Sequence, residues 1–346
     1  MKRIAVLAPE LSGRGGMETA FVNLYKALEN DRDYKIKFFF VEGVQDQKFL
    51  KKIPLNSFVC RKKENFFGEI LFLTRLILSN KYDIFIITSK RLIMLSTYIR
   101  KLLHINVPIF SWMHFSLSKE GIYVNLKKYG DAHFAISREI YSQIKKMGVS
   151  EDKIYYLPNY VNSTNEIIKE PSKIEYIYIG RIEFLRQKNF KELIDGLSQL
   201  KYKWTLDVYG DGQDKNLCQE YIENRYPNII NRIKWHGWTA DPWKCIKNGS
   251  ALILTSTMEG MPMVLIESLV RGLPVLSSNC PTGPRDIIRN GENGYLYKMG
   301  DLSDFQEKLD LLRKNKLNRA SVKQSVNKFS KEQYVKKIKS ALESYN

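Results

Sequence analysis

The sequence contains little cysteine, and its cysteines form no pattern. None belongs to a Cys-x-x-Cys pair or has a histidine at zinc-binding distance along the chain, so we expect neither a disulfide framework nor a zinc site. The four cysteines are Cys60, Cys218, Cys245 and Cys280. This pattern favours a reducing compartment and predicts a cytoplasmic protein.

Long hydrophobic runs are also missing. The apolar residues near the start end at Pro9, and the longest apolar stretch, 66–78, is interrupted by Glu69 and Arg75. Neither approaches the roughly 20 apolar residues of a spanning helix. We expect no secretory leader and no membrane span.

The composition that remains is that of a packed enzyme. Of 346 residues, 44% are hydrophobic and 27% charged, with no internal repeat or low-complexity segment. A chain of this length exceeds one ordinary core, so two domains are expected.

The charge is basic and localised. The net charge is +18, and residues 48–128 hold 15 Lys and Arg against four Asp and Glu. This excess is consistent with a merely solvated face, or with a surface for anionic lipid or a phosphorylated glycan. No nucleic-acid-binding motif accompanies it. We therefore expect peripheral contact with an anionic membrane through 48–128, at the inner face of the cytoplasmic membrane, and no nucleic-acid partner.

Short apolar runs alternate with helix-length segments through both halves of the chain. This alternation predicts an α/β protein with two parallel, doubly wound sheets facing across a cleft. The predicted strands are 3–8, 35–41, 83–88, 107–112, 131–137 and 153–158, and then 174–180, 203–210, 232–237, 250–256 and 274–278.

A polar stretch at 159–173, closed by a proline, separates the two sets of strands. Such a stretch is typical of a domain linker. We expect a first domain at 1–163 and a second domain at 174–330. A Lys-rich last helix at 331–346 would pack back on the first domain.

Ligands of open α/β sheets bind beyond the carboxyl ends of the strands, so we expect the functional residues in the loops that follow the strands. Gly15 and Gly16 follow the first strand and precede a helix expected near Met17. Glycines there let backbone N–H groups approach a diphosphate. A nicotinamide fingerprint would need glycine at position 18, where the chain has Glu18.

The strongest local signal follows the strand 250–256. It is Glu259-Gly260-Met261-Pro262, with Glu267 eight residues after the first glutamate. Gly260 permits a tight turn, and Pro262 suits the first position of a helix whose N–H groups face the ligand. One carboxylate is then placed for sugar hydroxyls and the other for a ribose.

Two cations follow the strand 174–180. Arg181 ends it and Lys188 comes after a short loop, with Arg186 a competitor for the same role. Cations there would face a donor diphosphate and replace a metal as the electrophile. We identify no Asp-x-Asp metal motif in the sequence, which favours a reaction without metal or other cofactor.

Three further strand ends carry candidates. His114 directly follows 107–112 and is assigned an active-site role near the donor sugar. Gly210, Trp235 and Gly237 close two strands of the second half and suit a backbone-and-aromatic pocket for a nucleobase.

Taken together, GGME, the histidine after a middle strand, GR with a following lysine, YGDG and EGMPMVLIE resemble glycosyltransferase family four over nearly the whole chain. These are retaining enzymes of the GT-B fold. FSWMHFSL, QKNFKELIDGLSQL, GDGQD, LTSTMEGMPM and GPRDII resemble the members of this family that add galactose to the lipopolysaccharide core.

The resemblance implies a hexosyltransferase whose donor is a nucleotide sugar, best UDP-galactose, and whose acceptor is lipopolysaccharide core or a lipid-linked O-antigen or capsule intermediate. It implies that Gly15 and Gly16 bind the diphosphate, Arg181 and Lys188 the phosphates, and Glu259 the donor-sugar hydroxyls. Glu267 would hold the ribose and His114 the sugar. The resemblance further implies that the domain at 1–163 binds the acceptor and that the domain at 174–330 binds the nucleotide sugar.

Other donors remain open, namely UDP-glucose, UDP-N-acetylglucosamine and GDP-mannose. A non-catalytic nucleotide-sugar or glycan-binding protein would share the fold but lack the cations and carboxylates.

Overall fold

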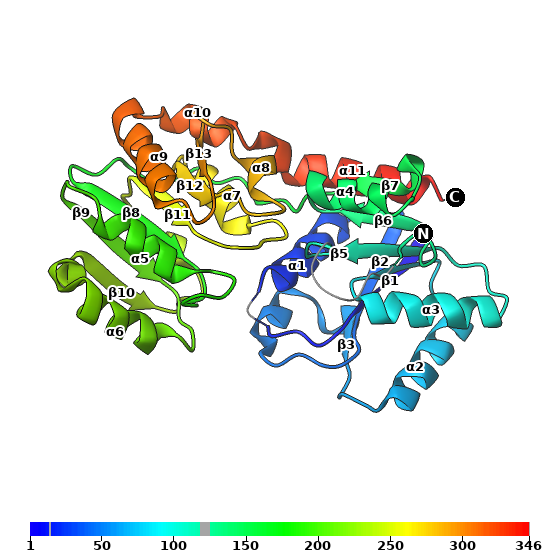
Figure 1. Cartoon of the computed structure of the whole chain (residues 1–346). Coiled ribbons are helices and arrows are strands. Elements are labelled where there is room, and N and C mark those ends of the chain that lie inside the picture. The colour runs from blue at the N-terminus through cyan, green and yellow to red at the C-terminus, as the bar shows by residue number, and fades with distance from the viewer. Residues whose placement is uncertain (14, 118–124, 346) are drawn as a thin grey trace. The chain divides into compact units, whose positions relative to one another are not determined.

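The computed structural model describes residues 1–13, 15–117 and 125–345. The chain forms two compact units (Figure 1). The first combines Met1–Tyr160 with the segment from Lys331 onward, and the second is Val161–Ser330.

The stretch that we expected to be a linker is bonded into the second unit. The Val161 N–H donates to the Phe329 carbonyl (3.1 Å), and the Ile168 N–H donates to the Arg271 carbonyl (2.9 Å). The observed junction therefore follows Tyr160, whereas the expected domains ended at 163 and began again at 174. Buried backbone groups need partners, and this polar stretch finds them in the second unit.

The first unit is built on a seven-stranded sheet in which every pairing is parallel. Its order is β3-β2-β1-β4-β5-β6-β7. Ile, Val, Phe and Ala dominate the central strands, because both faces of a parallel sheet are covered. The strands are β1 (Lys2–Ala8), β2 (Tyr34–Phe40), β3 (Phe58–Cys60), β4 (Ile84–Ile87), β5 (Ile109–Met113), β6 (Ala132–Ala135) and β7 (Ile154–Tyr156).

Helices cover this sheet on both faces. Asn65 caps the start of α2, where its side chain accepts from the Gly68 N–H (2.9 Å). Ser137 caps α4 in the same manner, since both side chains supply an oxygen to a free helix N–H. The helices are α1 (Gly16–Leu28), α2 (Phe66–Leu78), α3 (Lys90–Leu102), α4 (Arg138–Lys146) and α11 (Lys331–Glu343), with short turns η1 (Gln47–Lys52), η2 (Leu55–Ser57) and η3 (Glu151–Lys153).

The second unit contains a six-stranded parallel sheet in the order β10-β9-β8-β11-β12-β13. Its strands are β8 (Ile174–Ile179), β9 (Trp204–Tyr209), β10 (Ile233–Gly237), β11 (Ala251–Leu254), β12 (Val275–Ser278) and β13 (Gly294–Tyr297). The helices around it are α5 (Phe190–Ser198), α6 (Lys215–Arg225), α7 (Met263–Leu269), α8 (Pro284–Ile287), α9 (Leu302–Asn315) and α10 (Arg319–Gln324), with turns η4 (Pro227–Arg232), η5 (Pro242–Lys244) and η6 (Asn327–Phe329).

The helix α11 packs on α1 and β7 of the first unit. Tyr334, Ile338 and Leu342 recur at helical spacing and are buried. The Tyr334 ring lies 5.1 Å from that of Tyr160. The last helix therefore completes the core of a unit whose other residues lie far earlier in the chain.

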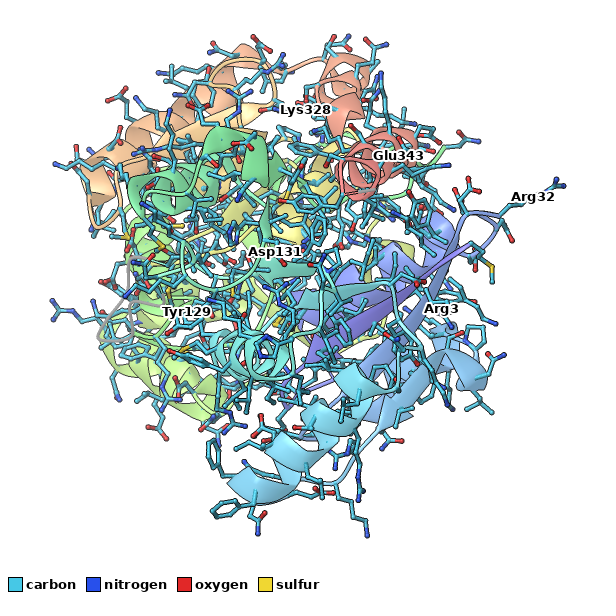
Figure 2. All side chains as sticks on the ribbon, turned by 90° about the vertical axis from the view of Figure 1, so that its right-hand side faces the viewer. Arg3, Arg32, Tyr129, Asp131, Lys328 and Glu343 are labelled. Carbon is cyan, nitrogen blue, oxygen red and sulfur yellow. The ribbon has the colours of Figure 1, made fainter. Side chains whose placement is uncertain are left out.

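Polar groups are also built into the first sheet. The Asp131 carboxylate, labelled in Figure 2, accepts from the Ile109 N–H (2.8 Å) and from Arg100. His133 on β6 is buried, with Nδ1 2.8 Å from the Ser111 hydroxyl. Burial lowers the pKa of His133 to about 4.

None of the described helices is both long and apolar enough to cross a bilayer.

Truncation of Ile338 tests the packing of α11. We expect Ile338→Ala to cost about 3 kcal/mol of stability in the first unit, because a buried side chain leaves a cavity. Amide hydrogen exchange in β6 and β7 should quicken. The exposed neighbour Lys336 gives the control, Lys336→Ala. Equal exchange in the two variants would contradict this role of α11.

The buried imidazole of His133 predicts acid sensitivity. Because its folded pKa of about 4 lies below the ordinary value of 6.5, the unfolded chain takes up the proton first as the pH falls. His133 should contribute about 2 kcal/mol to the drop in the free energy of unfolding between pH 6.5 and 5, and buried His114 a similar amount. His133→Gln should flatten this slope in thermal unfolding, and His104→Asn, at an exposed histidine, should not. An unchanged slope in His133→Gln would refute the assignment.

Candidate active site

Most predicted site residues lie at one edge of the second sheet. Arg181 follows β8, Gly210 follows β9, Gly237 ends β10, and the loop with Glu259 follows β11. All these strands are parallel, so their carboxyl ends meet at the same edge. The sheet thus gathers groups from segments far apart in sequence.

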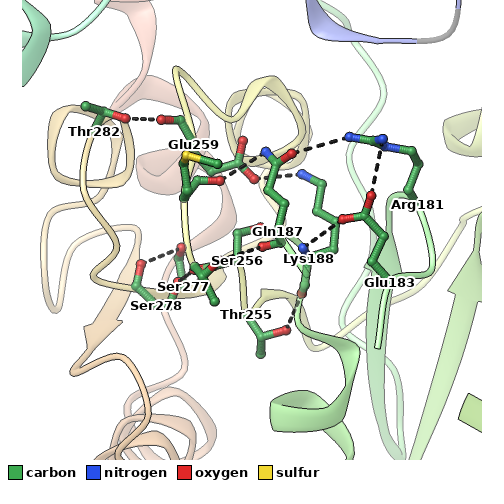
Figure 3. A network of polar contacts seen from close by, with 12 residues as sticks. Arg181, Glu183, Gln187, Lys188, Thr255, Ser256, Glu259, Ser277, Ser278 and Thr282 are labelled. Carbon is green, nitrogen blue, oxygen red and sulfur yellow. Dashed lines mark hydrogen bonds and ion pairs between the residues drawn. The ribbon is translucent and has the colours of Figure 1, made fainter. Parts of the chain in front are cut away.

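Lys188 and Glu259 form the central contact of this edge (Figure 3). The Lys188 ammonium lies 2.6 Å from Oε1 of Glu259, and both side chains are largely buried. The Thr255 hydroxyl lies within 3.1 Å of the Lys188 carbonyl and fixes the backbone that carries the lysine. The structure therefore brings together a cation and a carboxylate that are 71 residues apart.

Arg181 is held less tightly. Its guanidinium lies 3.2 Å from Glu183 and 3.3 Å from the Gln187 side-chain oxygen, and it is exposed. Gln187 donates in turn to the Met258 carbonyl (3.0 Å), while Glu183 accepts from the Lys188 N–H (3.1 Å). The side chain of Arg186 is exposed, so Lys188 is the cation that lies against the carboxylate.

A second loop supports the Glu259 loop from its other side. The Thr282 hydroxyl donates to the Glu259 carbonyl. Gly283 has φ +90°, and a Cβ there would lie 2.5 Å from Pro262 and 2.9 Å from the Gly260 carbonyl. Only glycine allows this approach. Met261 is buried beside them, which makes this loop a rigid support for the carboxylate.

Glu267 lies on α7, one residue nearer the start of the helix than expected. Pro262 is the N-cap, and the helix begins at Met263, whereas we expected Pro262 at the first helical position. Glu267 accepts from the Trp243 indole N–H (3.0 Å). Burial raises the pKa of the Glu267 carboxyl, and the Trp243 hydrogen bond opposes that rise. A ribose hydroxyl would have to share this carboxylate with the indole.

The strand ends assigned to the nucleobase are closely packed backbone. The Gly210 N–H donates to the Gly237 carbonyl (2.8 Å), and a Cβ on Gly210 would lie 1.9 Å from the Gly180 carbonyl. The Trp235 ring is half-buried and lies 5.5 Å from the Phe190 ring. Glycine is thus required at Gly210 for strand packing, whatever binds there.

Gly15 and Gly16 begin α1 in the first unit. The Glu18 carboxylate accepts from the Gly13 N–H (2.7 Å) and the Gly15 N–H (2.9 Å). A side chain added at Gly16 would meet nothing within 4 Å. We expected this helix N-terminus to be open to a diphosphate. Instead, the Gly15 N–H is already bonded to the Glu18 carboxylate, and only Gly16 has open space beside it.

His114 directly follows β5 and is buried. Its ring lies 4.4 Å from that of Trp112 and 6.2 Å from that of Phe21. Burial lowers the pKa of His114 to about 3, so the imidazole is neutral near pH 7. Its Nε2 has no hydrogen-bond partner in the described part of the chain. A neutral, unpaired nitrogen suits a hydrogen bond to a sugar hydroxyl rather than proton transfer.

One Asp-x-Asp triplet does occur in the sequence, at Asp31–Asp33. It precedes β2, at the amino end of the strand, and Asp31 pairs with Lys339 of α11 (2.9 Å). The triplet serves the packing of the first unit and lies away from the strand ends that carry the site.

Several supporting residues were not found from the sequence. Gln187, Glu183 and Thr282 act through loops whose contacts depend on tertiary structure, and no pattern marks them. Glu18 did carry a signal, because a glutamate three residues after a helix start predicts a capping box. No sequence signal marked Trp243 as a partner of Glu267, because it lies in η5 and the strand β11 separates η5 from α7.

Comparison with known proteins agrees with this geometry. Residues 162–333 match the family described as glycosyl transferases group 1. The chain is 36% identical over 322 residues to lipopolysaccharide 1,6-galactosyltransferase of Escherichia coli K12, covering 88% of this chain and 87% of that protein. It is 34% identical to the enzyme of the same name from Salmonella typhimurium LT2, with the same coverage.

The fold matches as well. The apo structure of lipopolysaccharide outer core galactosyltransferase WaaB aligns with a TM-score of 0.87 and 31% identity, covering 99% of this chain and all of that one. Anabaena HepE, solved with UDP and glucose, aligns with a TM-score of 0.78 at 18% identity, covering 99% of this chain and all of that one. This chain therefore belongs to the group 1 glycosyl transferases and has their GT-B fold of two Rossmann-like α/β units.

Proposed function

We propose that the protein transfers a hexose, galactose from UDP-galactose, onto lipopolysaccharide core or a lipid-linked O-antigen or capsule intermediate. In this reaction the bond between the anomeric carbon and the β-phosphate oxygen breaks, and a bond to an acceptor hydroxyl forms. The hydroxyl proton passes to the departing UDP phosphate. Attack on the face that UDP leaves retains the anomeric configuration.

The observation that carries this proposal is the buried contact between Lys188 and Glu259. A nucleotide-sugar donor has a diphosphate beside a ring of hydroxyls, so its site needs a cation beside a hydrogen-bond acceptor. Lys188 supplies the cation, with Arg181 on the neighbouring loop, and Glu259 supplies the acceptor. A charged hydrogen bond is worth about 1.5–3 kcal/mol, and more is gained as charge develops on the leaving phosphate.

The relatives support the choice of sugar and acceptor. Both 1,6-galactosyltransferases match over most of the chain, which favours galactose over glucose, N-acetylglucosamine or GDP-mannose. An acceptor made at the inner face of the cytoplasmic membrane implies that the enzyme works there as a peripheral protein.

The proposed chemistry needs no metal ion and no cofactor. Lys188 and Arg181 neutralise the departing phosphate, which is the task that a divalent cation performs in other transferases. His114 holds the sugar by a hydrogen bond. Because the acceptor hydroxyl attacks the anomeric carbon directly, no protein nucleophile takes part.

A donor panel tests the class of reaction and the sugar together. We expect release of UDP from UDP-galactose with a lipopolysaccharide-core acceptor, and no loss of rate in EDTA. UDP-glucose, UDP-N-acetylglucosamine and GDP-mannose should be turned over far more slowly. Preference for another donor would correct the sugar, inhibition by EDTA would refute the metal-free mechanism, and no binding of any donor by calorimetry would refute the enzyme assignment.

Substitutions in the buried pair test its role. Lys188→Ala and Glu259→Gln should each lower kcat/KM by about 100-fold, because each removes a charged group that faces the reacting donor. Arg186→Ala, two residues from Lys188 but exposed, is the matched control and should change the rate less than about threefold. Circular dichroism verifies folding. A loss in Arg186→Ala equal to that in Lys188→Ala would show that the wrong cation was chosen.

A further inference from the structure

The helix α2 is apolar on two sides. Its inner side buries Leu73 and Ile77 against the unit, as expected for a surface helix. Its outer side nevertheless exposes Phe67 (79%), Leu71 (49%) and Leu78 (54%). A helix whose outer face is also apolar has a partner that the isolated chain does not supply.

The orientation of α2 is fixed from within. The carboxylate of buried Glu69 pairs with Arg91 at the start of α3 (2.8 Å). The Phe72 ring packs on Phe39 of β2 (5.9 Å) and under the Arg61 guanidinium (3.8 Å). Since these contacts anchor the inner side, the outer face cannot turn inward without breaking them.

The outer residues form one stripe. Phe67, Leu71, Arg75 and Leu78 are exposed and follow one another at spacings of four, four and three residues. At about 100° per residue they lie within an arc of roughly 80°. Figure 1 shows α2 at the margin of its unit beside α3. The stripe is therefore a continuous surface, open along the length of the helix.

Positive charge surrounds this stripe. Lys62 and Lys63 precede α2, Lys81 follows it, and Arg75 lies within it, all exposed. The exposed carboxylate of Glu64, just before α2, is neutralised by Arg61 (2.7 Å), and Lys63 lies 3.6 Å from Glu10. In the described part of the chain, Lys62, Arg75 and Lys81 have no carboxylate partner. The only acidic residue of α2 is buried Glu69. A short apolar helix face flanked by cations is the pattern of an interfacial helix that meets anionic lipid.

We infer that α2 docks the protein on an anionic bilayer by inserting Phe67, Leu71 and Leu78 among the lipid headgroups. A second copy of the chain fits the same face poorly, because it would bring Arg75 and the flanking lysines of both copies together. We expected membrane contact anywhere within 48–128, and the inference assigns it to α2 alone. Positions 118–124 of that range lie outside the described residues.

The inference deepens the proposed function, since a lipid-linked acceptor requires an enzyme at the bilayer, but its test needs neither donor nor acceptor. The full chain is floated with vesicles of phosphatidylcholine alone, or with roughly 30% phosphatidylglycerol, at about 0.15 M salt, where attraction by charge alone is weakened. Wild type should bind the anionic vesicles. Phe67→Ser combined with Leu71→Ser and Leu78→Ser should weaken the partition constant by about tenfold or more.

The matched control changes three exposed apolar residues of the second unit, Ile167→Ser, Leu217→Ser and Ile230→Ser, with exposures of 47, 48 and 39%. It should bind as wild type does. In a separate variant, Phe67→Trp, brominated lipid should quench the added fluorescence, which contact by charge alone would not produce.

Equal binding by both triple variants, or no binding by wild type, would overturn the inference. So would a dimer that the α2 substitutions dissociate, seen by sedimentation velocity without vesicle binding. Galactose transfer to a delipidated core oligosaccharide should be unaffected by the α2 substitutions. Failure of that transfer in wild type would count against the proposed function, and vesicle binding would still decide the role of α2.

Discussion

The parallel direction of all strands in the second sheet is the constraint on which its chemistry depends. Each strand is followed by a loop at the same edge, so Arg181, Gly210 and Glu259 arrive there without being near one another in sequence. Because these loops meet at one edge, their backbones lie very close together. Gly210 and Gly283 stand at positions where a Cβ would collide with a neighbouring loop. The loops are rigid because their neighbours bond to them, and a rigid loop can hold a carboxylate for a ligand at little further entropic cost.

The two units use carboxylates in opposite ways. In the second unit the Lys188 ammonium neutralises the Glu259 carboxylate. A donor that enters the site would have to share both groups with this ion pair. In the first unit Glu18 caps a helix and satisfies backbone donors. An anion reaching that helix would meet Gly16 rather than the whole N-terminus. The first arrangement prepares a charged ligand site, while the second stabilises a turn.

The sequence predicted every strand of the two sheets except β3 and β13. Short segments dominated by apolar and aromatic residues, such as 35–41 and 174–180, indicate a buried strand. By contrast β3 is followed directly by charged residues, and β13 begins at a glycine and is followed by a lysine. Both form because a neighbouring strand offers hydrogen bonds. The strand-end positions of Lys188 and Glu259 followed from the pattern. Their contact, and the hold of Trp243 on Glu267, depend on how loops cross and could not be read from spacing.

The packing of α11 has a consequence for how the protein is made. The second unit is one continuous segment, Val161–Ser330, whereas the first needs α11 to cover Tyr160 and the residues around β7. A ribosome delivers the N-terminal part first, but that part lacks a piece of its core until the last helix has emerged. Domains usually mature in the order of synthesis. Here the later unit is the one that can finish first, and the earlier one remains without its last helix, and with part of its core uncovered, in the meantime.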